Sequence, residues 1–183
     1  LIGGGMANTF LQAQGYDIAS SFSEPKMLDE ARQILTQAQS LGKTIVLPSD
    51  VVMAQELDTP PASFMLDTMP QGKILDIGPK TVVEMLQFIH TAKTIIWNGP
   101  MGYFEHPNFA KGTLDIAQGI ARSTAYSAAG GGDTLAAIKQ AKVSPKFSYL
   151  STGGGAFLQY LESGSFPLLK IMEQFQHAML SKN

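Results

Sequence analysis

The chain has 183 residues, a length typical of one domain of roughly 100 to 200 residues built around one core. Hydrophobic residues make up 44% of it and charged residues 15%, a balance that excludes a disordered or low-complexity chain. The formal net charge of -2 leaves no basic excess to neutralise nucleic-acid phosphates, so nucleic acid is not an expected partner.

The absence of cysteine excludes disulfides, thiolate nucleophiles and cysteine-ligated zinc, and it favours a reducing compartment. No apolar run approaches the roughly 20 residues needed to cross a bilayer, and the N-terminus lacks the layout of a signal peptide. We therefore expect a soluble, cytoplasmic protein. Leu1 and Ile2 have the character of a strand end that enters a glycine turn, which suggests a fragment of a longer chain.

Short β-branched runs alternate with segments of helical period along the chain. The clearest helix pattern is opened by Ser23 with Pro25 and closed by Gly42. In chain order we expect a helix over 27–41, strands over 43–47 and 73–77, a helix over 81–90, a strand over 93–97, a helix over 109–122, a strand over 123–127, a helix over 134–142, a strand over 147–150, and helices over 156–162 and 167–180.

This alternation predicts an α/β fold of the doubly wound, Rossmann-like kind. Crossover helices of this length give a mostly parallel sheet with helices on both faces. Residues 55–72 lack clear periodicity, so we place a loop or a short hairpin there. Neither an internal repeat nor an interdomain linker is visible, and residues 1–183 are expected to form a single domain.

Almost every predicted strand runs into a turn marked by glycine or proline. In an open parallel sheet these turns share the carboxyl edge, where ligands bind. Glycine allows close backbone approach, and the free N–H groups of the following helix attract phosphate. The turns are Gly3-Gly4-Gly5, Gly78-Pro79, Asn98-Gly99-Pro100, Gly130-Gly131-Gly132 and Gly153-Gly154-Gly155.

For any single turn, the alternative is that glycine merely eases a tight strand-to-helix connection. Three triple-glycine turns favour phosphate binding, because each extra glycine costs up to about 1 kcal/mol of chain entropy. The G-x-x-x-x-G-K-[ST] motif is absent, and Asn8 stands where a G-x-G-x-x-G motif starting at Gly3 needs its last glycine. P-loop and dinucleotide sites, and with them an NAD-dependent oxidoreductase, are therefore disfavoured.

Asp133 is the acidic residue best placed for chemistry. It follows three glycines and precedes Thr134 at a predicted helix start. Its carboxylate suits an N-cap, and it equally suits a Mg²⁺ ligand, because magnesium in phosphate sites takes one or two carboxylates plus phosphate oxygens. The two roles are compatible.

The segment 97–105 is an apolar loop that ends in Glu105. Such a loop suits an adenine ring, and Glu105 suits ribose hydroxyls, although a solvated loop carboxylate fits the spacing equally well. Trp97 has the character of a core residue at a strand end. The three histidines and nine methionines show no spacing typical of metal ligation and fit structural or gap-filling positions.

Six motifs, in this order and spacing, closely resemble the C-terminal, nucleotide-binding domain of phosphoglycerate kinase. Together they extend over essentially the whole chain. They are 3–10 (GGGMANTF), 47–50 (LPSD), 76–79 (DIGP), 97–100 (WNGP), 130–134 (GGGDT) and 151–156 (STGGGA).

The resemblance implies a glycolytic, two-lobed, monomeric kinase that moves a phosphoryl group reversibly between 1,3-bisphosphoglycerate and ADP, giving 3-phosphoglycerate and ATP. It implies a site for ADP or ATP with Mg²⁺, in which Asp133 handles the magnesium nucleotide and Glu105 meets the ribose. The other implied residues are Gly4, Gly5, Pro100 and Gly102 for the adenosine pocket, Gly131, Gly132 and Thr134 for the phosphates, and Gly153, Gly154 and Gly155 facing the transferred phosphoryl group.

Two features of the family are missing. The lysine-bearing glycine segment that precedes the Gly3 region is absent, as is the basic N-terminal lobe that binds 3-phosphoglycerate, so this chain is not expected to be active alone. Residues 162–168 also depart from the family pattern, which has more glycine and a lysine there. The alternative function is a non-catalytic nucleotide-binding module that uses the same pocket.

Overall fold

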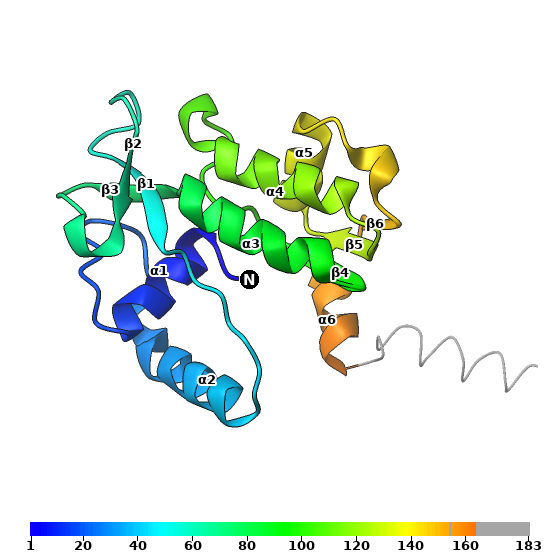
Figure 1. Cartoon of the computed structure of the whole chain (residues 1–183), viewed down its shortest axis with the longest axis horizontal. Coiled ribbons are helices and arrows are strands. Elements are labelled where there is room, and N and C mark those ends of the chain that lie inside the picture. The colour runs from blue at the N-terminus through cyan, green and yellow to red at the C-terminus, as the bar shows by residue number, and fades with distance from the viewer. Residues whose placement is uncertain (154, 164–183) are drawn as a thin grey trace, which may run out of the picture.

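The computed structural model describes residues 1–153 and 155–163, in which helices alternate with short strands (Figure 1). The α-helices are α1 (Gly4–Ala13), α2 (Leu28–Ser40), α3 (Pro79–Thr91), α4 (Lys111–Arg122), α5 (Gly132–Gln140) and α6 (Gly155–Ser163). The strands are β1 (Asp50–Ala54), β2 (Ala62–Met65), β3 (Lys73–Ile77), β4 (Thr94–Asn98), β5 (Tyr126–Gly130) and β6 (Tyr149–Ser151). Single 3-10 turns are η1 (Pro25–Met27), η2 (Leu66–Thr68), η3 (Pro107–Phe109) and η4 (Ser144–Lys146).

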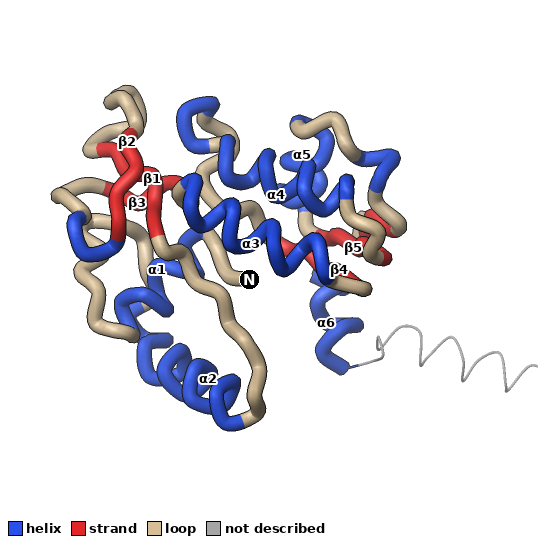
Figure 2. Tube along the Cα trace, viewed as in Figure 1, coloured by secondary structure: helices blue, strands red, loops and turns tan. Residues whose placement is uncertain are grey.

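The described strands form two separate three-stranded sheets (Figure 2). One is parallel with the order β4-β5-β6, and Ile96 of β4 is paired with Ala128 of β5. Helices α3, α4 and α5 lie on one side of this sheet and α6 on the other (Figure 1). The α/β class and the parallel sheet with its helices are therefore confirmed.

The second sheet is antiparallel, with the order β2-β1-β3. Its β1–β2 hairpin falls partly in the stretch 55–72, where a loop or short hairpin was expected. β3 was expected in the same parallel sheet as β4, but it pairs only with β1 among the described strands. The turn after β3 therefore belongs to a different sheet from the turns after β4 and β5.

Packing of α3 and α4 against the parallel sheet forms the main core. Buried side chains of α4 recur every three or four residues, as a helix with one apolar face requires, and Ile116 and Ile120 lie on that face. Met85 of α3 and Ile138 of α5 are fully buried beside them. Trp97, at the end of β4, stacks on Phe147 with ring centroids 6.3 Å apart.

Three boundaries differ from the sequence prediction. Residues 43–47 form no strand, because they make too few backbone hydrogen bonds with the neighbouring segment Leu1–Ile2. One such bond is present, from the Ile2 N–H to the Val46 carbonyl at 3.0 Å. The strand lies instead at β1, beyond Pro48. Strands β5 and β6 each begin two or three residues later than predicted.

Helix α1 was not predicted, although its buried residues Ala7, Phe10 and Leu11 follow a helical spacing. The predicted helix over 167–180 lies outside the described residues. None of the described helices combines the length and the apolar character that a membrane span requires.

Asp50 of β1 joins the antiparallel sheet to α3. Its buried carboxylate accepts hydrogen bonds from the N–H groups of Lys80 at 3.0 Å and Thr81 at 2.7 Å, in the first turn of α3. The Thr81 hydroxyl also donates to this carboxylate at 2.7 Å. Asp50 therefore acts as the N-terminal cap of α3 from another element of the fold.

We expect Asp50→Ala to lower the free energy of unfolding by about 3 kcal/mol, because it removes a cap and leaves buried donors without an acceptor. Urea denaturation of the variant and the parent protein measures this difference. Asp58→Ala is the control, since Asp58 is exposed in a loop and a change below about 0.5 kcal/mol is expected there. Equal losses in the two variants would contradict the capping role.

Candidate functional site

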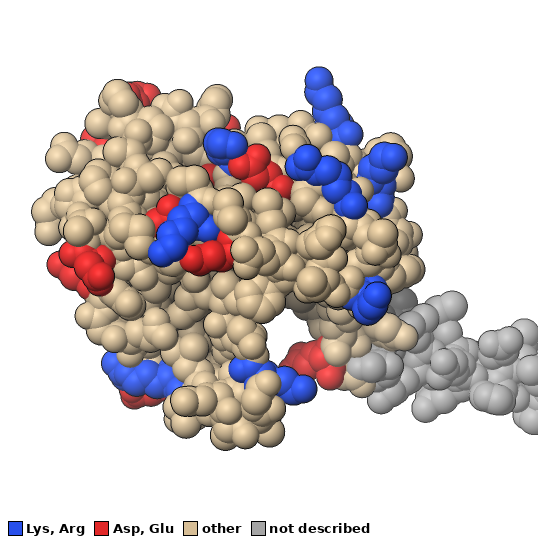
Figure 3. Space-filling model, in the orientation of Figure 1, with Lys and Arg blue, Asp and Glu red and all other residues tan. Residues whose placement is uncertain are grey.

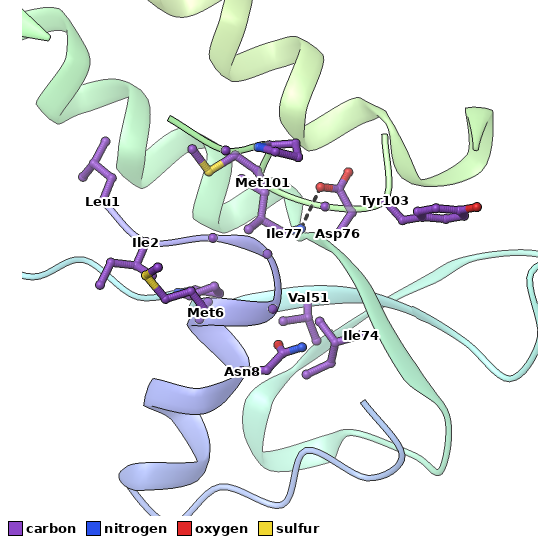
Figure 4. A pocket seen from close by; sticks show the side chains of 18 of the residues that line it. Leu1, Ile2, Met6, Asn8, Val51, Ile74, Asp76, Ile77, Met101 and Tyr103 are labelled. Carbon is purple, nitrogen blue, oxygen red and sulfur yellow. Dashed lines mark hydrogen bonds between the residues drawn. The ribbon is translucent and has the colours of Figure 1, made fainter. Parts of the chain in front are cut away.

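A cavity of about 580 Å³ opens where α1 begins, at the carboxyl ends of β3 and β4 (Figure 4). Backbone forms much of its wall, from the glycine turn 3–5 and from the loop 99–102. The two turns are joined by a hydrogen bond from the Gly4 N–H to the Met101 carbonyl at 2.8 Å. The turn that follows β4 and the turn that follows the extended Leu1–Ile2 segment therefore meet at one edge of the cavity, which we call its rim.

Glycine is needed at this rim because the chains approach closely. Gly4 has a φ of +61°, a conformation that residues with a side chain rarely adopt. A Cβ on Gly5 would lie 2.7 Å from the ring of Phe22, and one on Gly102 would lie 2.5 Å from the Leu75 carbonyl oxygen. Any side chain at Gly5 or Gly102 would therefore have to displace a wall of the cavity.

Side chains around the backbone rim are mainly apolar. Ile2, Met6 and Met101 project toward the space between α1 and the loop after β4 (Figure 4). Trp97 contributes to the lining but is 4% exposed, and its indole N–H donates to the Gly99 carbonyl at 2.7 Å, so it acts as a core residue that shapes the loop. The cavity suits a flat apolar ring held between backbone segments.

Asp76, at the end of β3, is the charged residue among those that line the cavity. It is 3% exposed, and its carboxylate accepts from the N–H groups of Gly112 at 2.6 Å and Ile77 at 2.9 Å (Figure 4). Burial raises the pKa of Asp76 to about 7, although both hydrogen bonds favour the carboxylate and lower this value. The nearby Asp115 carboxylate raises the pKa and the Lys111 ammonium lowers it.

Asp76 caps α4 as Asp50 caps α3, since Gly112 lies in the first turn of α4. The N-terminus of α5 is different. It follows Gly131, which has a φ of +94°, and no side chain caps it. The N–H groups of its first turn are therefore available to a ligand, and the helix dipole makes that ligand preferably an anion.

The open end of α5 lies beside the cavity. The Gly99 N–H donates to the Thr134 hydroxyl at 2.7 Å, and a Cβ on Gly131 would lie 2.8 Å from Oδ1 of Asn98. Asn98 and Gly99 both line the cavity. An extended ligand that leaves the cavity past Asn98 therefore reaches the uncapped turn of α5.

The structure brings most of the predicted site residues into these two adjoining places. Gly4, Gly5, Pro100 and Gly102 line the cavity. Gly131, Gly132, Asp133 and Thr134 form the start of α5, where Asp133 is exposed and Thr134 is buried with its hydroxyl engaged by Gly99.

The remaining predicted residues lie apart from the cavity lining. Glu105 is exposed in the loop after β4. Gly153 and Gly155 lie at the start of α6, whose Phe157 ring packs against Gly130, and Gly154 lies outside the described residues. The turn at Gly78, expected at the ligand-binding edge, is instead closed by Asp50, because the Asp50 carbonyl accepts from the Gly78 N–H at 2.9 Å.

Sequence reasoning missed the roles of Asp50 and Asp76. Asp76 gave a signal, because it is an acidic residue inside the apolar strand pattern 73–77, and such a residue needs a polar partner when buried. Its partner, Gly112, is 36 residues away in sequence, so the capping role emerges only from the fold.

No group of three or more His, Cys, Asp or Glu side chains gathers as a metal site within the described part of the chain. Asp133 offers one exposed carboxylate beside the open turn of α5. One carboxylate fits Mg²⁺ that is held mainly by phosphate oxygens and water, and it does not fit a cation held by protein ligands alone.

The family model of phosphoglycerate kinase matches residues 1–164. The chain belongs to the phosphoglycerate kinase family. Among curated relatives, the phosphoglycerate kinase of Legionella pneumophila (strain Lens) is 50% identical over 175 residues, which cover 94% of this chain and 44% of the relative. That of Francisella philomiragia subsp. philomiragia is 44% identical over 177 residues, which cover 95% of this chain and 45% of the relative.

Solved structures agree with the sequence relatives. The phosphoglycerate kinase from Coxiella burnetii matches with a TM-score of 0.90 and 44% identity, over 94% of this chain and 45% of that one. The phosphoglycerate kinase from Pyrococcus horikoshii OT3 matches with a TM-score of 0.80 and 28% identity, over 93% and 44%. The chain thus spans slightly less than half the length of these phosphoglycerate kinases, and the family resemblance in the six motifs is confirmed.

Asp76 makes the stability depend on pH in a specific direction. Its pKa is about 7 in the folded chain against an ordinary value of 3.8, so the folded state holds a proton that the unfolded state loses between these values. The free energy of unfolding should therefore fall as pH rises from 4 to 7, by an amount on the order of a few kcal/mol.

Asp76→Asn should flatten this part of the pH profile, measured by urea denaturation at several pH values. Asp17→Asn, at an exposed loop position, should keep the slope of the parent protein. If both variants retain the same slope between pH 4 and 7, Asp76 is not the titrating group.

Proposed function

We propose that this chain is the nucleotide-binding, C-terminal domain of a two-lobed phosphoglycerate kinase and takes part in reversible phosphoryl transfer between 1,3-bisphosphoglycerate and ADP. The observation that carries the proposal is the pairing of an apolar, glycine-lined cavity with the uncapped N-terminus of α5. Helices α3 and α4 have their N-termini closed by buried carboxylates, whereas the first turn of α5 has no such carboxylate.

The adenosine part of ADP or ATP occupies the cavity in this proposal. Gly4, Gly5, Pro100 and Gly102 provide backbone walls close enough to enclose an adenine ring, and apolar side chains cover its faces. Glu105 is exposed beyond the lining, where its carboxylate accepts hydrogen bonds from ribose hydroxyls.

The phosphates extend from the cavity to the start of α5. The N–H groups of Gly132 and Asp133 there have no intrahelical acceptor, as is general for the first turn of a helix. The hydroxyl oxygen of Thr134 accepts a hydrogen bond from the Gly99 N–H, which holds this turn beside Gly99. Asp133 binds the Mg²⁺ of the magnesium nucleotide, and the metal supplies the positive charge that offsets the phosphates.

Charge neutralisation by protein side chains is sparse here. Neither lysine nor arginine lines the cavity among the described residues, and on the face seen in Figure 3 the basic side chains are scattered among acidic ones. Phosphate binding by this chain therefore rests on backbone N–H groups, the helix dipole and the magnesium ion.

Transfer of the phosphoryl group needs alignment more than acid–base chemistry. An acyl phosphate is already a reactive donor, so holding both reactants in line and stabilising the charge of the transferred group account for most of the catalysis. In this proposal Gly153, Gly154 and Gly155 open α6 toward the group in transfer. The second substrate, 3-phosphoglycerate or 1,3-bisphosphoglycerate, binds to a lobe outside this chain, within a monomeric, cytoplasmic, glycolytic enzyme.

The phosphate part of the proposal predicts that Mg-ADP binds at least about tenfold more tightly than adenosine, a difference of about 1.4 kcal/mol. Asp133→Asn should abolish most of this difference and leave the affinity for adenosine unchanged. Isothermal titration calorimetry with adenosine, ADP and Mg-ADP separates these contributions.

Asp67→Asn is the matched control, because Asp67 is an exposed carboxylate in η2 and lies outside the cavity lining. It should change neither affinity. Equal binding of adenosine and Mg-ADP by the parent protein would contradict the phosphate site at α5 while leaving the adenosine cavity in place.

The chain covers less than half the length of its relatives, and this leads to a second prediction, about activity. Since the chain spans 44% of the Legionella pneumophila relative, the 183 residues alone should transfer no phosphoryl group from 1,3-bisphosphoglycerate to ADP above the uncatalysed background. A coupled assay with that relative as the positive control measures this. Binding of Mg-ADP without turnover also fits a non-catalytic nucleotide-binding module, and turnover on addition of the missing lobe distinguishes the enzyme.

A further inference from the structure

Two buried threonines hold the loop 99–102, which forms one wall of the cavity. The Gly99 N–H donates to the hydroxyl of Thr134 at 2.7 Å. Two residues later, the Met101 N–H donates to the hydroxyl of Thr113 at 3.0 Å. Neither threonine is among the residues that line the cavity, so both hydroxyls reach the loop from outside it.

The two threonines occupy the same position in their helices. Thr113 is the third residue of α4 and Thr134 is the third residue of α5, and both are almost fully buried. Helix α3 has a threonine at this position too, Thr81, which is equally buried and accepts from the N–H groups of Ser49 and Asp50. A threonine in the first turn of a helix thus accepts a backbone N–H three times in this fold, and two of these three bonds hold the wall of the cavity.

Met101 is bound through both of its backbone groups. Its N–H is held by Thr113 of α4, and its carbonyl accepts from the Gly4 N–H at 2.8 Å, in the turn that starts α1. Its side chain lines the cavity and packs closely on the glycine turn, since a Cβ on Gly3 would lie 2.6 Å from the Met101 sulfur (Figure 4). A shift of Met101 away from Thr113 would therefore disturb both backbone walls of the cavity.

The first turn of α4 also fixes the next residue of the loop. The Gly112 N–H donates to the Asp76 carboxylate at 2.6 Å, and a Cβ on Gly102 would lie 2.5 Å from Oδ1 of Asp76. Two successive residues of α4 thus hold two successive residues of the loop. No residue of α4 lines this cavity, so the helix acts on it through the loop.

The Thr113 hydroxyl is hard to replace as an acceptor. The hydrogen bond from Met101 is buried, so water does not readily take the place of the hydroxyl. A buried N–H group that loses its acceptor carries a free-energy cost, which favours conformations of the loop that supply another acceptor. Removing the hydroxyl should therefore move the loop even where the shape of the side chain is kept.

We propose that Thr113 is a positioning residue for the nucleoside part of the nucleotide. Its hydroxyl keeps Met101, and with it the wall 99–102, in the conformation that accepts adenosine. This role rests on the proposed function, in which adenosine occupies the cavity. Since the phosphates of that proposal lie at the start of α5, Thr113 should affect the affinity for the nucleoside and not the gain in affinity that the phosphates add.

Thr113→Val keeps nearly the shape of threonine and removes the hydroxyl. It should weaken adenosine and Mg-ADP by the same factor, about tenfold, because the loop would then be in the binding conformation only about one-tenth of the time. The ratio of the two affinities should stay that of the parent protein, whereas Asp133→Asn lowers this ratio. Thr113→Ser keeps the acceptor and should bind both ligands within about twofold of the parent protein. Isothermal titration calorimetry measures all of these affinities.

Thr81→Val is the matched control. It removes an equally buried hydroxyl from the same position of α3, where the N–H groups that it accepts, those of Ser49 and Asp50, lie outside the cavity lining. It should lower the stability toward urea at least as much as Thr113→Val and bind adenosine like the parent protein.

Hydrogen exchange in the parent protein tests the same bond without a substitution. Adenosine should slow exchange at the Met101 amide, because the binding conformation requires the bond to Thr113. It should leave exchange at the Ser49 and Asp50 amides, which are bonded to Thr81, unchanged. This measurement decides the question even where Thr113→Val does not fold.

Four results would overturn the positioning role. Adenosine could bind Thr113→Val as tightly as the parent protein, or leave exchange at the Met101 amide unchanged. Thr113→Ser could lose as much affinity as Thr113→Val, which would assign the effect to packing, and an equal loss in Thr81→Val would assign it to general destabilisation. If the parent protein does not bind adenosine, the adenosine site of the proposed function is refuted, and this role with it.

Discussion

Two buried carboxylates determine where this fold is closed and where it is open. Asp50 of β1 caps α3, and Asp76 of β3 caps α4, so the antiparallel sheet holds the N-termini of two of the helices that cover the parallel sheet. Capping by a side chain from a distant element fixes the position of a helix as well as its end. The rim of the cavity depends on this arrangement, because Gly102 packs directly on Asp76 and the Tyr103 N–H donates to the Leu75 carbonyl at 2.7 Å.

The N-terminus of α5 differs from the capped N-termini of α3 and α4. Anions are attracted to any helix N-terminus, but a terminus already occupied by a buried carboxylate has neither free donors nor a favourable potential for a second anion. Among α3, α4 and α5, α5 alone lacks such a carboxylate, since Asp133 of its first turn is exposed and Gly131 precedes it. Of these three helices, α5 is therefore the one whose first-turn N–H groups are open to an anion, and no basic side chain lines the adjoining cavity among the described residues.

Local patterns in the sequence predicted the positions of helices and strands better than they predicted which strands pair with one another. Helix α3 and strands β3 and β4 lie within two residues of their predicted positions, because a buried face and a glycine or proline boundary are both local signals. The strand predicted at 43–47 does not form, because a strand depends on its partner segment and not on its own sequence alone. This segment makes one backbone hydrogen bond to its neighbour, Ile2.

The same limit applies to the site. The glycine turns 3–5, 98–100 and 130–132 were visible as candidate ligand contacts, and three of the cavity glycines, Gly4, Gly5 and Gly102, were named from the family resemblance. The sequence did not reveal that the Gly78 turn is closed by Asp50, nor that Asp76 lies beneath Gly102. These facts depend on contacts between residues 26 and 28 positions apart, which neither periodicity nor spacing encodes.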